Sequence, residues 1–387
     1  MFRSAMLRPV LPMLALLLSA GASSALAQDA PRPKKVEPLV IAREGSVYAG
    51  GEVITGPEGV FHYDHLYAYY QIPVNPRKHP LVMWHGCLSP AWETTPDDRE
   101  GYQQIFVRRG WSVYVIDQPR TGRAGRGLEG FTVAPASLSG EPSSWNTFRI
   151  GKWLPPDPPT FFPGVQFPRD PASLKHYFQY GNSTGGPPFA PGRPTPSDAA
   201  PVTSDAVSAL LDRIGPSVLV THSASGIMGW VTRTKTEKVK GIVAYEPTAF
   251  VFPNDEPPPP PVPTADPFVA AIVAPVMVSP QEFDRVTKIP IQIVYGDNIE
   301  FTTPSPIFGV ELWRVTMQVV RQFADAVNRR GGDVTILHLP NVGIHGNTHF
   351  PFFDLNNVQV ADLMSQYLHE KGLDKRGGKH EHDNDED

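Results

Sequence analysis

Short apolar segments alternate with helical ones along most of the chain, and this alternation constrains the fold more than any other feature. Most of the strand-like segments are rich in Val, Ile and aromatic residues, which is typical of strands buried on both faces of a sheet. Strands are expected at residues 39–48, 64–73, 81–84, 111–117, 217–221, 241–245, 291–295 and 334–339, and helices at 99–109, 227–234, 311–328 and 358–370. This order predicts an α/β fold with a mostly parallel central sheet flanked by helices, and an antiparallel hairpin or edge pair from the first two strands.

Two proline-rich insertions interrupt the alternation. Residues 141–200 contain 13 of the 44 prolines, and residues 145–189 contain ten of the 39 aromatic residues. So many aromatic side chains predict a cap folded over a site, and an Ω-like decoration packed on itself is the alternative. The second insertion, residues 252–267, includes five consecutive prolines, which predict a stiff, exposed polyproline II loop.

The start of the chain has the pattern of a secretory signal peptide. Arg3 and Arg8 give a positive start, residues 10–18 form an apolar run, and Ala-Leu-Ala precedes Gln28. The run is shorter than the ~20 residues of a spanning helix, so cleavage after Ala27 is favoured over a retained anchor, giving a secreted or periplasmic protein without membrane contact. The expected segments are a signal peptide at 1–27, an α/β domain at 28–372 with the cap at about 125–200 and the proline-rich loop at about 252–267, and a charged, disordered tail at 373–387.

Charge and cysteine content exclude several classes of function. A formal net charge of −5 over 387 residues gives no broad basic surface, which argues against nucleic-acid binding through phosphate neutralisation. The single cysteine, Cys87, rules out an internal disulfide and any zinc or iron–sulfur site with several cysteine ligands. We expect neither a metal nor an organic cofactor.

A nucleophile is predicted where the fifth expected strand turns into the next helix. The connecting residues 221–226 are THSASG, and a sharp turn that exposes a nucleophile needs small residues two before and two after it. Thr221 and Ser225 occupy these positions, with Ser225 in place of the usual glycine, so Ser223 is the candidate. The alternative is an ordinary serine-rich helix start, because serine is a favoured N-cap residue.

Acyl transfer by such a serine requires backbone N–H groups directed at the developing oxyanion. In a site of this kind one donor follows the nucleophile, here Ala224, and the other lies in the loop after an earlier strand. The sequence HGCL at 85–88 occupies that loop, and the Cys87 amide is expected to be the second donor. Cys87 could instead be a thiol nucleophile, but no elbow sequence surrounds it.

The general base is expected in the loop between the last strand and the last helix, which reads NVGIHGNTHF at 341–350. His349 lies nearer the helix and is favoured over His345, which would then form hydrogen bonds within the loop. His222 is a weaker rival, because it is adjacent to Ser223 and neighbouring side chains on a tight turn point in different directions.

Three carboxylates satisfy the chain order serine, acid, histidine. Glu246 follows the strand at 241–245, whereas Asp297 and Glu300 follow the strand at 291–295, where most such enzymes keep the acid that orients the histidine. Each has a structural alternative: Asp297 could cap a loop, Glu300 could be solvated and Glu246 could pair with an arginine. The residue pattern alone leaves the choice open.

These motifs resemble those of the α/β-hydrolase superfamily, and more narrowly those of a small branch of secreted bacterial carboxylesterases. The resemblance implies an α/β-hydrolase fold, a base that maps onto His349, and a glutamate acid after the sixth strand that maps onto Glu246. It is poor in the insertion at 125–200, so substrate scope does not transfer. The matching sequences are HGC at 85–87, WETTPD at 92–97, VIDQ at 115–118, HSASG at 222–226, EP at 246–247, GD at 296–297, IE at 299–300 and HGNTH at 345–349.

The sequence therefore predicts a secreted serine hydrolase that cleaves small-molecule carboxylic esters through Ser223, His349 and Glu246 and an acyl-enzyme intermediate. An amidase, lactonase or acyltransferase of the same fold, and a non-catalytic binding protein on this scaffold, are the alternatives. A homodimer is compatible with the sequence, which does not fix the oligomeric state. The cap aromatics expected to line an acyl or alcohol pocket over Ser223 are Trp145, Trp153, Phe161, Phe162 and Phe167.

Overall fold

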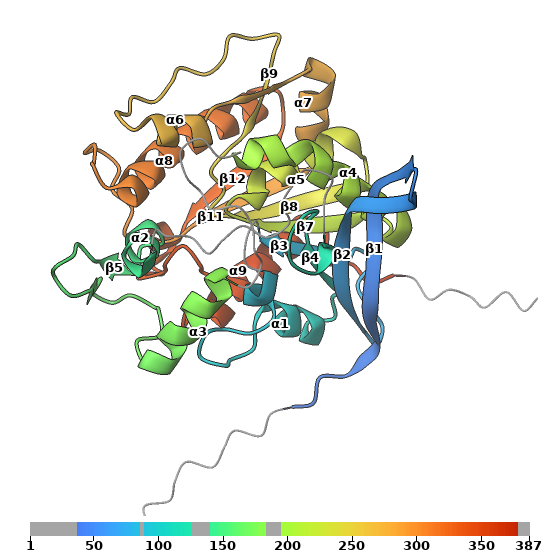
Figure 1. Ribbon diagram of the computed structural model, residues 1–387, viewed down its shortest axis with the longest axis horizontal. Coiled ribbons are helices and arrows are strands. Elements are labelled where there is room, and N and C mark those ends of the chain that lie inside the picture. Colours follow the sequence, from blue (N-terminus) through green and yellow to red (C-terminus); the bar gives the residue numbers. More distant parts are fainter. Residues whose placement is uncertain (1–36, 86–88, 126–139, 183–194, 378–387) are drawn as a thin grey trace, which may run out of the picture. The chain divides into compact units, whose positions relative to one another are not determined.

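The computed structural model of the chain describes residues 37–85, 89–125, 140–182 and 195–377. The expected signal peptide, Cys87 and most of the charged tail lie outside the described residues. The described secondary structure belongs to one compact unit that begins at Leu39, and a central sheet runs through it (Figure 1).

This sheet has eight strands in the order β1-β2-β4-β3-β7-β8-β11-β12. The six strands from β4 to β12 in this order are parallel, whereas β1 and β2 form an antiparallel hairpin at one edge and β2 pairs antiparallel with β4. The expected mostly parallel sheet and its edge hairpin are thus confirmed. The strands are β1 (Ile41–Gly56), β2 (Gly59–Pro73), β3 (Leu81–His85), β4 (Val113–Asp117), β7 (Ser217–His222), β8 (Val239–Tyr245), β11 (Pro290–Tyr295) and β12 (Asp333–His338).

Helices cover both faces of the sheet (Figure 1). The core on one face contains side chains of α4, α5 and α8, and the core on the other contains side chains of α1 and α9. The strand residues alternate between the two cores, as the two-residue period of a strand requires: on β7, Leu219 faces one core while Val218 and Val220 face the other. The helices are α1 (Tyr102–Arg108), α2 (Gly140–Thr147), α3 (Pro171–Asn182), α4 (Pro196–Ile214), α5 (Ser225–Lys235), α6 (Pro267–Ile272), α7 (Pro280–Val286), α8 (Phe308–Arg329) and α9 (Asn357–Glu370).

Five of these helices, α2, α3, α4, α6 and α7, lie outside the segments in which the sequence predicts helix. Four of the five begin with a proline, and each of these prolines follows a residue that favours the N-cap position. Proline is tolerated in the first helical turn, because the N–H that it lacks has no partner within the helix there. The high proline content therefore marks helix starts as well as loops. The pairs are Asp170-Pro171, Thr195-Pro196, Asp266-Pro267 and Ser279-Pro280.

The described part of the aromatic insertion consists of α2, a short antiparallel pair and α3, and we call it the cap segment (140–182). Its strands are β5 (Gly151–Lys152) and β6 (Thr160–Phe161). Residues of this segment, including Trp145 and Phe167, join the core on the side of α1 and α9. The segment also contacts α8, where a Cβ on Gly309 would lie 2.3 Å from Thr147 Cα. The cap segment is thereby fixed against the domain at the carboxyl end of β11.

The second insertion runs from β9 (Val251–Pro253) to α6, and the described residues 254–266 form neither helix nor strand. Its backbone is held against α8, because Arg314 and Gln322 donate hydrogen bonds to the carbonyl oxygens of Pro263 and Pro260. A further strand, β10 (Val276–Val278), pairs in parallel with β9. None of the helices in the described ranges is both long and apolar enough to span a bilayer.

Candidate active site

Ser223 occupies a sharp turn between β7 and α5. Its φ angle is +55°, in the left-handed region that residues other than glycine rarely adopt. The backbone N–H of Ser223 donates to the carbonyl oxygen of Tyr245 at 2.9 Å, and its own carbonyl accepts from Gly226 at 2.9 Å. This strained strand-turn-helix connection is the geometry of a nucleophile elbow.

Two small residues after Ser223 allow this turn. The Ser225 hydroxyl accepts a hydrogen bond from the His222 N–H at 2.9 Å and lies 2.9 Å from the Trp84 carbonyl oxygen on β3. A Cβ on Gly226 would lie 2.5 Å from Pro247 Cβ. The close approach that requires a glycine is therefore at position 226, and Ser225 instead ties the turn to the neighbouring strand.

His349 is completely buried and is oriented by its neighbours. Its Nδ1 lies 3.4 Å from Glu246 Oε2, its ring stacks on Phe148 with centroids 5.0 Å apart, and Trp313 packs 4.6 Å away. Nε2 has no hydrogen-bond partner among the described residues. Burial holds the pKa of His349 well below its ordinary value, and the positive charge of Arg149 lowers this pKa further. The ring is thus neutral near pH 7, with one nitrogen facing an acid and the other available.

Glu246 follows β8 in a left-handed conformation with a φ of +53°. Its carboxylate is fully buried, and Oε1 accepts hydrogen bonds from the Gly296 N–H at 2.5 Å and from Arg149 Nη2 at 2.6 Å. Burial raises the pKa of Glu246, while the Arg149 charge and the Gly296 hydrogen bond act in the opposite direction. Oε1 is therefore held by two donors, and Oε2 faces His349.

The other two candidate acids lie elsewhere. Asp297 accepts a hydrogen bond from the Gly346 N–H at 2.8 Å, and its Oδ2 lies 3.5 Å from Nδ1 of the exposed His345. Glu300 is exposed and accepts hydrogen bonds from the Thr302 and Thr303 amides. The structure therefore brings together His349 with Glu246, and His345 with Asp297.

His222 supports the turn that carries His349. It is buried, and its Nε2 lies 2.7 Å from the His349 carbonyl oxygen, so Nε2 carries the proton and donates. Ser223 follows His222 directly, and the Ser223 amide binds the residue before Glu246. Through these bonds the ends of β7 and β8 and the histidine loop meet at one place.

Arg149 is the main residue that the sequence reasoning missed. It lies in the cap segment with a φ of +58° and is 3% exposed. Besides its bond to Glu246, its Nε donates to the Asp297 carbonyl oxygen at 2.8 Å and its guanidinium lies 4.9 Å from the Trp313 ring. Pairing with an arginine was the structural alternative to an acid role for Glu246. In the structure the Glu246 carboxylate contacts both Arg149 and His349. No sequence signal singles out Arg149 among the other arginines.

Asp354 also escaped the sequence reasoning. This buried carboxylate accepts hydrogen bonds from the Thr348 N–H at 2.7 Å, from the Thr348 hydroxyl at 2.9 Å and from Asn347 Nδ2 at 3.1 Å. Burial raises the pKa of Asp354. Its three bonds fix Asn347 and Thr348, the two residues before His349.

The predicted oxyanion-hole and pocket residues are only partly described. Ala224 is buried directly after Ser223, at the start of α5, whereas Cys87 lies outside the described residues. Trp145, Trp153 and Phe161 line a cavity of about 620 Å³ within the cap segment. Ser223 does not line that cavity, so the expected pocket over Ser223 remains a prediction.

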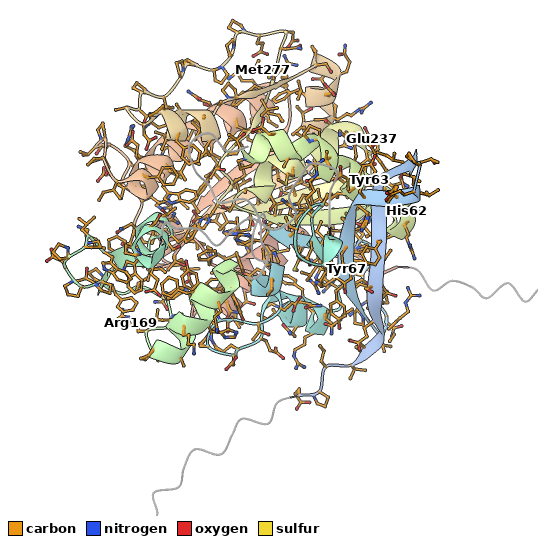
Figure 2. All side chains as sticks on the ribbon, in the orientation of Figure 1. His62, Tyr63, Tyr67, Arg169, Glu237 and Met277 are labelled. Atoms are coloured by element: carbon orange, nitrogen blue, oxygen red, sulfur yellow. The ribbon has the colours of Figure 1, made fainter. Side chains whose placement is uncertain are left out.

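The two other predicted pocket residues have different surroundings. Phe162 lines a smaller cavity of about 170 Å³ beside α8. Phe167 is fully buried and packs against Tyr177 and Phe353. Arg169 lies at the exposed edge of the cap segment (Figure 2). Its guanidinium lies 5.2 Å from the Phe161 ring. Among the described residues, no group of three or more His, Cys, Asp or Glu side chains is placed to hold a metal ion.

Comparisons with known proteins give relatives that cover most of the chain. No family model matches the sequence. A protein named a probable secreted lipase, phiG, from Fungal sp. (strain ATCC 74256) is 26% identical over 328 residues, which cover 78% of this chain and 85% of that protein. A solved structure described as a novel bacterial esterase is 29% identical, with a TM-score of 0.66, and the match covers 87% of this chain and 98% of the esterase.

Proposed function

We propose, on the premise that the chain has the α/β-hydrolase fold, that it hydrolyses carboxylic esters with Ser223 as the nucleophile. The observation that carries the proposal is the buried, neutral His349, whose Nδ1 faces Glu246 and whose Nε2 is left without a partner among the described residues. The similarity to a bacterial esterase and to a probable secreted lipase supports an ester as the substrate. The lipase is named as secreted, which supports export of this chain as well.

The reaction uses the two nitrogens of His349 in different roles. Nε2 takes the proton of the Ser223 hydroxyl as the oxygen attacks the ester carbonyl, and then gives this proton to the leaving alcohol. A water molecule, activated by the same nitrogen, hydrolyses the acyl-enzyme. The Ala224 and Cys87 amides stabilise the oxyanion in both steps.

The acid in this mechanism is Glu246, and the cap segment assists it through Arg149. When His349 gains a proton, the imidazolium is stabilised by the carboxylate that its Nδ1 faces. A buried carboxylate tends to take up a proton, because its charge loses solvation. The 2.6 Å bond from Arg149 opposes this tendency and favours the ionised form of Glu246. Arg149 is thus a positioning residue that acts through Glu246.

Labelling and kinetics of a serine variant test the proposal. A fluorophosphonate probe should label the wild-type protein at Ser223, and Ser223→Ala should lose both labelling and p-nitrophenyl ester hydrolysis. Turnover should fall by a factor on the order of 10⁴–10⁶, because the serine, base and acid act as a unit. The matched control is Ser208→Ala on α4, whose hydroxyl bonds only to the Ser204 carbonyl in the described structure. Near-normal turnover of a folded Ser223→Ala protein would refute the proposal.

A further inference from the structure

The cavity of about 170 Å³ lies between the cap segment and α8. Arg149 lines it and also binds Oε1 of Glu246, whereas His349 faces Oε2. Most of its wall is apolar. The apolar lining residues are Leu154, Phe162, Ile299, Ile307, Val310 and Trp313.

Two residues of the same wall each carry a buried hydrogen-bond donor. Arg149 Nη1 and Asn298 Nδ2 are both buried, and neither has a hydrogen-bond partner among the described residues. A guanidinium has no acceptor atoms, and the NH₂ end of an amide only donates. A buried donor without a partner is unfavourable, so an acceptor oxygen that reached either atom from the cavity would stabilise it.

The shape and polarity of the cavity favour a small amphiphile over water alone. Its volume of about 170 Å³ has room for several water molecules. A buried water needs two to four polar partners, and the apolar side chains offer none. A ligand with an acceptor head at Arg149 and Asn298 and a short hydrocarbon tail satisfies both parts of the wall.

We propose that this cavity binds a short-chain carboxylate. The carboxylate accepts hydrogen bonds from Arg149 Nη1 and Asn298 Nδ2, and the hydrocarbon tail contacts the apolar wall. Lys152 also lines the cavity and adds positive charge. The one acidic residue of the lining, Glu300, is compensated by hydrogen bonds from the Thr302 and Thr303 amides.

A ligand bound in the cavity would affect the proposed catalytic groups through Arg149. Its Nε already binds the Asp297 carbonyl and its Nη2 binds Glu246. A carboxylate at Nη1 would give the third guanidinium nitrogen a hydrogen-bond partner. The added negative charge offsets the effect by which Arg149 lowers the pKa of His349. A bound carboxylate should therefore shift the acid limb of ester hydrolysis to higher pH, and this consequence, unlike binding itself, rests on the proposed function.

Binding is tested with butyrate and its neutral analogue butyramide, on protein whose Ser223 has been blocked with a fluorophosphonate. Affinity is measured by calorimetry on the whole protein. Butyrate should bind about tenfold more tightly than butyramide, because hydrogen bonds to a charged acceptor are about twice as strong as neutral ones. Val310→Phe should abolish binding by filling the cavity, and Asn298→Gly should weaken it while keeping the φ of +58°. The control is Val358→Phe, an exposed position on α9.

Three results would overturn the proposal: equal affinity for butyrate and butyramide, binding that survives Val310→Phe unchanged, and binding that is lost when Ser223 is blocked. The last result would place butyrate at the nucleophile instead of in this cavity. If the probe fails to label Ser223, the proposed function fails, while the same titration on unlabelled protein still decides the cavity proposal.

Discussion

Four residues other than glycine adopt a positive φ around the proposed catalytic groups: Ser223, Glu246, Arg149 and Asn298. Each costs on the order of 1–3 kcal/mol, and such strain persists only where the surrounding structure holds it. Here the bonds from Ser223 to Tyr245, and from Glu246 to Val294, fix two of these turns at the carboxyl ends of parallel strands. The backbone strain is therefore concentrated in the turns that direct these side chains toward the proposed site.

The identity of the acid can be tested with two isosteric variants. Glu246→Gln should lose far more turnover than Asp297→Asn, because only Glu246 contacts His349. A neutral amide cannot stabilise the imidazolium and can hold the wrong histidine tautomer. Steady-state kinetics on one ester decide the order. If Asp297→Asn is the more damaging change, the acid is at the position after β11 that most such enzymes use.

Arg149 should set the lower pH limit of activity. Its charge lowers the pKa of both His349 and Glu246, so in Arg149→Met both pKa values rise and the acid limb of the kcat/KM profile moves to higher pH. Removing one partner of a buried ion pair should also cost about 3–5 kcal/mol of stability.

Arg149→Lys is the matched variant, because it keeps the charge and loses the second contact to Asp297. It should restore the acid limb toward that of wild type even where kcat stays low. An unchanged pH profile in Arg149→Met, with stability alone reduced, would assign Arg149 a purely structural role.

The sequence predicts those of the proposed catalytic groups that have a local signature. Ser223 was predicted from the strand-turn-helix context and His349 from its place before the last helix. Arg149 and Asp354 have no such signature, because their roles arise from contacts between segments far apart in the chain. Glu246 was separated from Asp297 by resemblance alone, since both carboxylates follow buried strands.

Among the secondary-structure elements, the strands can be predicted from local sequence more accurately than the helices. Buried parallel strands are continuous apolar runs, so the predicted strands at 81–84 and 291–295 agree with β3 and β11 within one residue. Helix α4 is absent from the prediction, because its first residues fall in the proline-rich insertion at 141–200 that was expected to form a cap. Pro196 is in the first turn of this helix, and Asp198 completes a capping box with Thr195. A capping residue followed by proline was the available signal.

The cap segment provides a test of substrate contact. Trp153 and Phe161 are half-buried and line the larger cavity, whereas Phe167 is fully buried in the core. We expect Trp153→Ala and Phe161→Ala to raise KM for bulky esters more than for acetate esters, because apolar area worth roughly 1.5–3 kcal/mol per side chain becomes unavailable to the substrate. Kinetics on p-nitrophenyl esters of graded chain length measure this.

Phe167→Ala is the matched control for a structural role. It should lower the melting temperature, with a cost of about 3–5 kcal/mol, and change KM equally for both classes of ester. If Trp153→Ala and Phe161→Ala behave in the same way as this control, the cap segment is structural decoration.

At the scale of the whole domain, three buried histidines couple the site to stability. The rings of His85 and His222 have centroids 4.3 Å apart, and those of His222 and His349 are 4.4 Å apart. All three are almost completely inaccessible to solvent. They join β3, β7 and the loop before α9, so protonation of any one places a charge in the centre of the folded unit.

These three histidines should therefore destabilise the protein in mild acid. Burial holds the pKa of each of these three histidines well below 6.5, so below pH 6.5 the unfolded chain binds more protons than the folded one. The contribution of these histidines to the free energy of unfolding is then fully retained above pH 6.5 and falls as the pH drops below it, by up to about 1.4 kcal/mol per pH unit for each histidine. The raised pKa values of Asp354 and Glu246 act in the opposite direction and reduce the net slope. Urea unfolding of Ser223→Ala between pH 5 and 8 measures this slope. Adding His222→Gln should reduce the number of protons taken up on unfolding by one, and the glutamine amide can still donate a hydrogen bond to the His349 carbonyl. His62→Gln, at an exposed position on β2 (Figure 2), is the control, and an equal slope in both double variants would contradict the prediction.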